Sequence, residues 1–317
     1  MFDDTNIPGI QPPEQRTPSD TDSADALVIL DTDIGYDPDD LVAVVIAART
    51  VTNLAVVTAD ETRGRRARLA RHLLDLLDRT DVPVIAGLDL GGEHRFLADH
   101  GAGIPRYSDT TGEERNDRID QLTDDIARLC TTATGSIRWV GMGPMSNLNA
   151  VLSHVPDMAE RLTVTQMGGW LDHYRDQTRA SHNFHTDPTS AGLALRMLAA
   201  PRLVLSEHTN SPLIHVTPEW ALVRRLSAPT APTAPTWASL LAAHFRMWST
   251  RRPGSWMHDP LTLSAALGMP FVTFGREPIR IGRDARLHRD PNGRPIEVSV
   301  EVDYDGFLDW MHEAVRA

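Results

Sequence analysis

The sequence predicts an α/β fold in which helices flank a mainly parallel sheet. Apolar runs of strand length alternate with helical patterns from residue 26 onward. Residues 26–30 form a continuous apolar run with β-branched side chains, which is typical of a strand buried on both faces. The apolar residues that follow, Leu41, Val44 and Ala48, have helical spacing. Repeated units of this kind build a parallel sheet that binds ligands at the carboxyl ends of its strands.

The same alternation predicts the later elements. Further strands are expected at 54–59, 82–87, 136–143, 162–169 and 202–208, and further helices at 61–79, 121–130, 147–155 and 191–200. Two alternating runs around the turn 290–293 predict a C-terminal antiparallel hairpin, and a closing helix follows at 306–315.

A single domain is expected over residues 26–317, because no change in composition divides this part of the chain. Residues 1–25 are rich in Pro, Asp, Ser and Thr, which predicts a flexible N-terminal tail. A Pro/Thr repeat at 228–237 predicts an exposed loop between helices, a kind of loop that can also border a pocket.

Charge and composition narrow the classes of partner. The formal net charge of -12 repels nucleic acid and anionic membrane surfaces, so neither is expected to bind. One cysteine, Cys130, excludes an internal disulfide and a cysteine-rich metal site. The chain lacks an apolar run of the roughly 20 residues that a membrane helix needs and begins without a secretory pattern, so we expect a cytoplasmic protein.

A dense group of carboxylates follows the first predicted strand. Five aspartates lie within ten residues: Asp31, Asp33, Asp37, Asp39 and Asp40. Carboxylates packed together repel one another, and a bound cation offsets this repulsion. Because all five offer oxygen, the group favours a hard cation, Ca²⁺ before Mg²⁺. A single D-x-D would more often be a solvated, helix-capping loop, but five acids after a buried strand favour a metal site.

Three further segments could carry chemistry. His258 and Asp259 follow a Pro-Gly turn and precede an apolar helical run, where such a pair is also compatible with a helix cap. The turn at 140–148 is a strand–helix connection whose glycines let backbone carbonyls approach a ligand. Asn183 could bind sugar hydroxyls or simply stabilise its loop.

Four motifs occur in the order and at about the spacing found in the inosine-uridine preferring nucleoside hydrolases: DTDIGYDPDD, VGMGPMSNL, MGGW with NFHTDP, and WMHDP. The chain resembles this family from about Val28 to the C-terminus. The resemblance implies a Rossmann-like, nucleoside hydrolase-like domain and a calcium-dependent N-ribohydrolase that acts on a small riboside. It also implies a homodimer or homotetramer.

The resemblance further implies a role for individual residues. In the family the first acidic loop and the late aspartate chelate Ca²⁺, which also holds the ribose diol and the attacking water. The metal ligands carried over to this chain are Asp33, Asp39, Asp40, Asp259 and the backbone carbonyl of Ser146. Asp33 would also be the general base, and His258 the acid that protonates the departing base.

The substrate contacts are carried over in the same way. Asp39 would meet the ribose 2′-hydroxyl, Asp259 the 3′-hydroxyl, and Asn183 the ribose hydroxyls. His100 resembles a family histidine near the base. His244 and Trp248 lie on a predicted helix where the family places base contacts, although aromatic residues at that spacing also suit a core.

The chain departs from the family pattern in three places, one of which is the loop after the second strand, where Ala59-Asp60-Glu61 replaces the usual Gly-Asn. The acidic loop is two residues longer, which leaves Asp37 without an assigned role. Ser181 and Arg175 stand where the family usually has a Glu and an Asn on the ribose 5′-hydroxyl. Loss of a carboxylate and gain of an arginine favour a 5′-phosphate or another 5′ substituent, unless these cations lie on a solvated loop.

Two other functions remain open at the level of sequence. An apolar strand followed by Asp31-x-Asp33 also resembles the nucleophile loop of haloacid dehalogenase-type phosphatases, although Gly35 replaces the usual Thr or Val and the late His-Asp pair has no role there. The altered 5′ contacts also fit a riboside-binding protein that retains the metal and has lost turnover.

Overall fold

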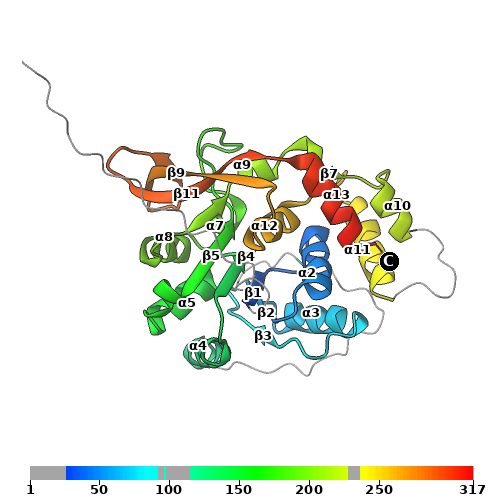
Figure 1. Ribbon diagram of the computed structural model, residues 1–317, viewed down its shortest axis with the longest axis horizontal. Coiled ribbons are helices and arrows are strands. Elements are labelled where there is room, and N and C mark those ends of the chain that lie inside the picture. Colours follow the sequence, from blue (N-terminus) through cyan, green and yellow to red (C-terminus); the bar gives the residue numbers. More distant parts are fainter. Residues whose placement is uncertain (1–25, 92–95, 98–114, 228–235, 317) are drawn as a thin grey trace, which may run out of the picture.

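Nine strands of the described chain form one sheet in the order β10-β9-β11-β6-β5-β4-β1-β2-β3 (Figure 1). The computed structural model describes residues 26–91, 96–97, 115–227 and 236–316, so the predicted tail at 1–25, His100 and most of the Pro/Thr repeat lie outside it. The strands are β1 (Leu27–Thr32), β2 (Leu54–Thr58), β3 (Val84–Ala86), β4 (Ile137–Gly141), β5 (Leu162–Met167), β6 (Arg202–Val204), β9 (Val272–Ile281), β10 (Leu287–Arg289) and β11 (Arg294–Val302).

The parallel part of the sheet has the strand order of doubly wound folds. Strands β1 to β6 all pair in parallel, and β1 lies between β2 and β4. The chain turns to opposite sides at this point, which places a crevice at the carboxyl ends of β1 and β4. Every residue of β1 is buried, as the continuous apolar run predicts.

The C-terminal strands are antiparallel, as predicted, but the turn at 290–293 does not join two directly paired strands. Strand β9 pairs with β10 along one edge and with β11 along the other. The turn therefore crosses over β9, and a Cβ added to Gly293 would lie 2.4 Å from the backbone carbon of Ile279. Glycine is required here because the two backbones meet without room for a side chain.

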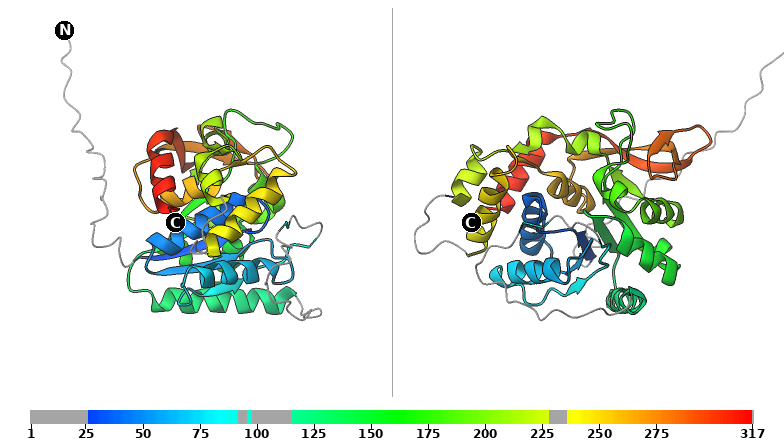
Figure 2. Two further views of the ribbon diagram at one scale, coloured as in Figure 1. Left: turned by 90° about the vertical axis from the view of Figure 1, so that its right-hand side faces the viewer. Right: turned by 180° about the vertical axis from the view of Figure 1, so that it is seen from behind.

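Helices cover both faces of the sheet (Figures 1 and 2). Alternate side chains of β1 belong to two different hydrophobic clusters. Val28 and Leu30 pack with one set of helices, and Leu27 and Ile29 pack with the other. The first set is α2 (Pro38–Thr50), α3 (Arg65–Leu76), α11 (Thr236–Ser249), α12 (His258–Ala266) and α13 (Tyr304–Ala314). The second set is α4 (Arg115–Thr132), α5 (Ser146–His154) and α8 (Pro188–Met197).

Short elements connect these layers. A small antiparallel sheet pairs β7 (His215–Val216) with β8 (Ser255–Trp256). The remaining short helices are α6 (Met158–Arg161), α7 (His182–Thr186), α9 (Ser206–Thr209), η1 (Pro212–Ile214) and α10 (Ala221–Ser227). Among the described residues, the helices are too short or too polar to cross a bilayer.

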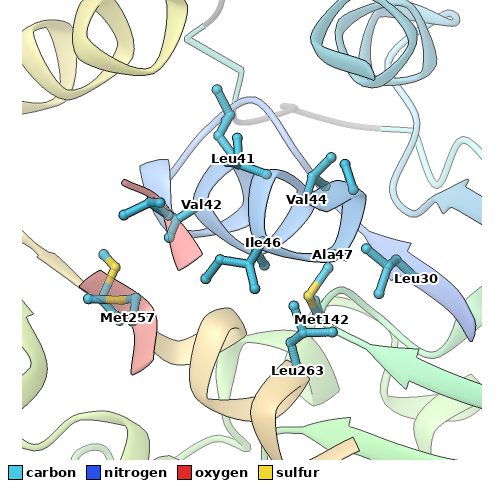
Figure 3. Close-up of a cluster of buried hydrophobic side chains, with 14 of the residues drawn as sticks. Leu30, Leu41, Val42, Val44, Ile46, Ala47, Met142, Met257 and Leu263 are labelled. Atoms are coloured by element: carbon cyan, nitrogen blue, oxygen red, sulfur yellow. The ribbon is translucent and has the colours of Figure 1, made fainter. Parts of the chain in front are cut away.

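Helix α2 lies inside the molecule and determines where the acidic residues sit. Its residues from Pro38 to Ala48 are all buried. Figure 3 shows Leu41, Val44 and Ile46 pointing in different directions around the helix. A helix that is apolar on every side is typically buried and surrounded by other elements of the fold. The helix therefore holds its N-terminal turn, which follows β1, in a fixed position beside α12.

Candidate active site

The structure brings the two distant acidic motifs together. Asp39 and Asp40 lie in the first turn of α2, and Asp259 lies in the first turn of α12. One carboxylate oxygen from each residue lies within 4.8 Å of the other two. The backbone N–H of Asp259 also faces Asp39 Oδ2 at 3.4 Å. The carboxylates thus gather at two helix N-termini, whose unpaired N–H groups favour negative charge.

The electrostatics of this cluster suit a cation. Asp39, Asp40 and Asp259 are each no more than 4% exposed. Burial, and then repulsion from the neighbouring carboxylates, raises the pKa of all three well above the usual value of 3.8. A divalent cation would remove this penalty, and the donor set consists of oxygen alone. The residues present therefore fit a hard metal ion.

Asp33 lies at the edge of the cluster. It is partly exposed, while its charge still acts on Asp39, Asp40 and Asp259. The turn after β4 approaches it closely, because a Cβ added to Gly143 would lie 3.2 Å from the Asp33 backbone nitrogen. Asp33 is thus a partly exposed carboxylate beside a buried acidic cluster, and such a group is able to accept a proton from water.

Buried Arg66 holds the acidic loop by its backbone. The Arg66 side chain is 1% exposed, and its Nη1 donates to the carbonyl oxygens of Asp33 and, at 2.9 Å, of Ile34. Its Nε donates to the Asp60 carbonyl at 2.8 Å, and Nη2 lies 3.5 Å from the Asp60 carboxylate. Its positive charge lowers the pKa of Asp40, against the stronger effect of burial. Arg66 is thus a fixed counter-charge behind the cluster.

Glu61 in turn fixes the start of the helix that carries Arg66. The Glu61 carboxylate accepts hydrogen bonds from the backbone N–H groups of Thr62 at 2.7 Å, Arg66 at 2.9 Å and Ala67 at 3.0 Å. It also accepts one from Thr58 Oγ1 at 2.5 Å. A carboxylate that satisfies N–H groups in the first turn stabilises a helix start.

Asn147 joins the carboxyl ends of three strands. Its Nδ2 donates to Asp31 Oδ1 at 2.7 Å and to the Thr58 carbonyl at 3.0 Å, and its Oδ1 accepts from the Leu88 N–H at 2.9 Å. The Asp31 carboxylate is thus hydrogen-bonded within the fold, and burial raises its pKa to about 8. The first aspartate of the acidic loop is therefore a structural residue.

Two residues carried over from the family pattern are engaged with the fold. Ser146 begins α5, and its Oγ donates to Asp187 Oδ2 at 2.8 Å. Asn183 Nδ2 donates to the Met142 carbonyl at 2.7 Å and to the Met167 carbonyl at 3.3 Å. These bonds fix the turns after β4 and β5 beside the acidic cluster.

Asp37, for which the sequence offers no role, is the N-cap residue of α2. Its side chain makes no capping bond and instead accepts a hydrogen bond from Ser255 Oγ in β8. Burial raises the pKa of Asp37 to about 7. The extra acidic residue thus ties the loop to the segment that leads into His258.

His244 and Trp248 support the same loop from α11. His244 is fully buried, and its Nε2 lies 3.0 Å from the Tyr36 carbonyl oxygen. The Trp248 ring meets the Tyr36 ring edge-on with centroids 5.2 Å apart, and its Nε1 donates to the Gly254 carbonyl at 2.7 Å. Both side chains therefore position the acidic loop.

His258 lies at the start of α12 beside Asp259. Burial lowers the pKa of His258 to about 3, and the positive charges of His182, Arg175 and His215 act in the same direction, against a hydrogen bond with the Thr209 backbone. The imidazole is therefore neutral near pH 7 in the free protein. Arg175 is exposed and lies over the ring of Trp256, 5.8 Å from its centroid.

Ser181 is buried and fixes the Gly168–Gly169 turn, because its Oγ accepts from the Gly169 N–H at 2.7 Å. Sequence reasoning did not identify Arg66, Glu61 or Asn147. Glu61 follows a strand end in the place where the family pattern changes, which is the one signal that the sequence offers.

Comparisons with known proteins identify the family of this chain. The family model of the inosine-uridine preferring nucleoside hydrolases matches residues 28–309. A pyrimidine-specific ribonucleoside hydrolase, RihA of Escherichia coli, is 22% identical over 91% of this chain and 98% of its own.

Two solved structures share the fold. An inosine-guanosine nucleoside hydrolase has a TM-score of 0.71 and 20% identity, with 92% of this chain and 98% of that chain covered. The type III effector protein XopQ, solved with adenosine diphosphate ribose, has a TM-score of 0.65 and 19% identity, with 91% and 93% covered. The family model alone spans most of the sequence, and its enzymes cleave the N-glycosidic bond of ribosides. This chain is therefore an N-glycosyl hydrolase and a member of the inosine-uridine preferring nucleoside hydrolase family.

Proposed function

We propose that the enzyme is a calcium-dependent ribohydrolase whose centre is formed by Asp39, Asp40 and Asp259. One observation carries the proposal: residues 220 positions apart in sequence present three buried carboxylate oxygens within 4.8 Å. All donors are carboxylates, which suits Ca²⁺, while Mg²⁺ demands a stricter octahedral shell. When bound, the ion would supply a positive centre that holds ribose hydroxyls and makes a water molecule more acidic.

Asp33 is the general base in this proposal. It is partly exposed, as is Asp37, but only Asp33 lies against the glycine turn after β4, while the Asp37 side chain accepts a hydrogen bond from Ser255. Its carboxylate takes a proton from the attacking water, whose oxygen then bonds to C1′ as the bond from C1′ to the base nitrogen breaks. The transition state resembles an oxocarbenium ion, so the surrounding carboxylates stabilise its positive charge.

His258 assists the departure of the base. Burial keeps its imidazole neutral in the free protein, so its N–H group can donate a hydrogen bond. Negative charge develops on the base as the bond to C1′ breaks, and a donor aimed at that charge stabilises the transition state. The departing base nitrogen takes up one proton beside His258, and Asp33 gives up the proton that it took from the water, so the reaction as a whole adds one water molecule across the bond. Asp39, Asp259 and Asn183 are the proposed contacts of the ribose hydroxyls.

Reducing-sugar release from a panel of ribosides tests the proposed function. The panel includes purine and pyrimidine nucleosides and phosphorylated ribosides, since XopQ was solved with a phosphorylated riboside. We expect release with calcium present and loss of release in excess chelator. Equal rates with and without chelator, or no release from any riboside, would contradict the proposal.

The assembly and the compartment are also proposals. The family resemblance supports a homodimer or homotetramer, which light scattering on the purified enzyme tests by its mass. A location in the cytoplasm is proposed from the sequence pattern alone. Cell fractionation tests this location.

A further inference from the structure

A loop beside the proposed centre, residues 171–179, is anchored far more firmly than its exposure suggests. Glu207 accepts hydrogen bonds from three successive backbone N–H groups, those of Leu171 at 2.9 Å, Asp172, and His173 at 2.8 Å. Tyr174 Oη donates to the Leu287 carbonyl at 3.0 Å and accepts from its N–H at 2.9 Å. The loop is therefore held between α9 and the C-terminal strands.

The carboxylates of this loop are occupied by other arginines. Asp172 pairs with Arg289 through two bonds of 2.8 and 2.7 Å. Asp176 lies 3.2 Å from Arg179. These contacts lower the pKa of both aspartates, of Asp172 mainly through Arg289 and of Asp176 mainly through its bonds to Thr178. Arg175 lies between them in sequence and makes no ion pair within the described part of the chain.

The Arg175 guanidinium is directed instead toward the segment that carries His258 and Asp259. It lies over the ring of Trp256. The centroid of this ring is 4.0 Å from that of His215 and 6.4 Å from that of His258. Trp256 Nε1 is buried and has no hydrogen-bond partner among the described residues. A buried donor without a partner is costly, which is typical of a group that a ligand satisfies.

Two regions of opposite charge thus meet at His258. Asp39, Asp40 and Asp259 form the acidic region. The basic side chains near His258 are Arg175, His182 and His215, of which Arg175 is always charged. A riboside whose 2′,3′-diol is bound at the acidic region has one ribose hydroxyl left, the 5′-hydroxyl. A guanidinium fork matches the oxygens of a phosphate carried there.

We propose that Arg175 binds a phosphate ester on the substrate, so that the preferred ribosides carry a 5′-phosphate. The inference rests on the proposed function for the orientation of the ribose. The selectivity for the phosphate comes from the anchoring of the loop 171–179. The C-terminal strands and Glu207 hold this loop so that Arg175 lies over Trp256.

Binding of ribose 5-phosphate and of ribose, measured by calorimetry with calcium present, tests this assignment. We expect the wild-type enzyme to bind ribose 5-phosphate more tightly than ribose. Arg175→Gln should reduce this preference roughly 10-fold or more, because a charge-assisted hydrogen bond is lost. The matched control is Arg179→Gln, which removes an exposed arginine of the same loop and should leave the preference unchanged.

Equal binding of the two sugars by the wild type, or equal losses in both variants, would overturn the assignment. A second measurement compares the hydrolysis of nucleosides with that of their 5′-monophosphates. Cleavage of nucleosides without any preference for the phosphate refutes this inference and leaves the proposed function standing. Arg175-dependent binding of ribose 5-phosphate without any hydrolysis refutes the proposed function and supports the ligand assignment.

Discussion

At the scale of single residues, the aspartates of the acidic loop have two roles: some make hydrogen bonds within the fold, and others form the cluster of the site. Asp31 is bonded to Asn147, and Asp37 accepts from Ser255, so both are part of the framework. Asp39 and Asp40 share the cluster with Asp259. Sequence could place five carboxylates at a strand end, but which of them point inward depends on partners up to 220 residues away.

Arg66 should control the affinity for the metal without touching it. Arg66→Met removes the bonds to the Asp33 and Ile34 carbonyls together with the counter-charge near Asp40. Outer partners of metal ligands typically contribute 10- to 100-fold in affinity, so we expect calcium to bind roughly 10-fold more weakly or worse. Calorimetric titration of calcium measures this change.

The control for Arg66 is Arg68→Met on the same helix, whose Nη1 donates to the Arg63 carbonyl at 3.3 Å. This variant should bind calcium like the wild type. Unchanged calcium binding in Arg66→Met, with the fold intact by circular dichroism, would contradict the role given to Arg66.

At the scale of elements, the strand ends are aligned by polar side chains from the helices that follow. The sequence predicts the alternating strands and helices, because period and length are local properties. It does not predict the crossover at Gly293, because local alternation fits both a simple hairpin and a strand pair separated by β9. The roles of His244 and Trp248 depend on the packing of α11 against the acidic loop, which local pattern does not show.

Asn147 should contribute strongly to stability at this scale. Asn147→Ala leaves the Leu88 N–H, the Thr58 carbonyl and Asp31 without their buried partner. Unsatisfied buried groups cost about 1–3 kcal/mol each, so with three groups affected we expect the free energy of unfolding to fall by about 3 kcal/mol or more. Urea denaturation measures it.

The comparison for this change is Asn149→Ala in the same helix, where the side chain makes one bond of 3.3 Å to Ser190 Oγ. We expect a smaller loss for this variant. Equal losses of unfolding free energy in the two variants would contradict the stabilising role given to the Asn147 bonds, which join β1, β2 and the segment after β3.

At the scale of the whole molecule, the fold brings two segments that are far apart in sequence to one crevice. Helix α2 follows the first strand, and α12 arrives after more than 200 further residues and packs against it. This contact lies at the point where the order of the parallel strands reverses, between β1 and β4. The resemblance to a known family, and not local pattern, predicted the pairing of the two acidic motifs.

The stability of the enzyme should depend on pH and calcium together. The raised carboxylate pKa values mean that the metal-free fold binds protons that the unfolded chain has released, so its stability falls as pH rises from about 4 to about 8. Calcium competes with these protons and binds more tightly at high pH. We expect the rise in melting temperature on adding calcium to be larger at pH 8 than at pH 5.5.

Thermal melts at the two pH values, each with calcium and with chelator, measure this difference. A calcium effect that is the same at both pH values, or larger at pH 5.5, would show that the buried carboxylates do not take up protons in the metal-free protein.

The most direct test follows calcium occupancy and reducing-sugar release together as calcium is returned to metal-free enzyme. The account predicts that both rise with one midpoint and saturate at one ion per chain. Asp259→Asn should shift both curves to higher calcium concentration, because it removes one of the three clustered carboxylates. Full activity before any calcium binds, or binding that leaves the rate unchanged, would contradict the account.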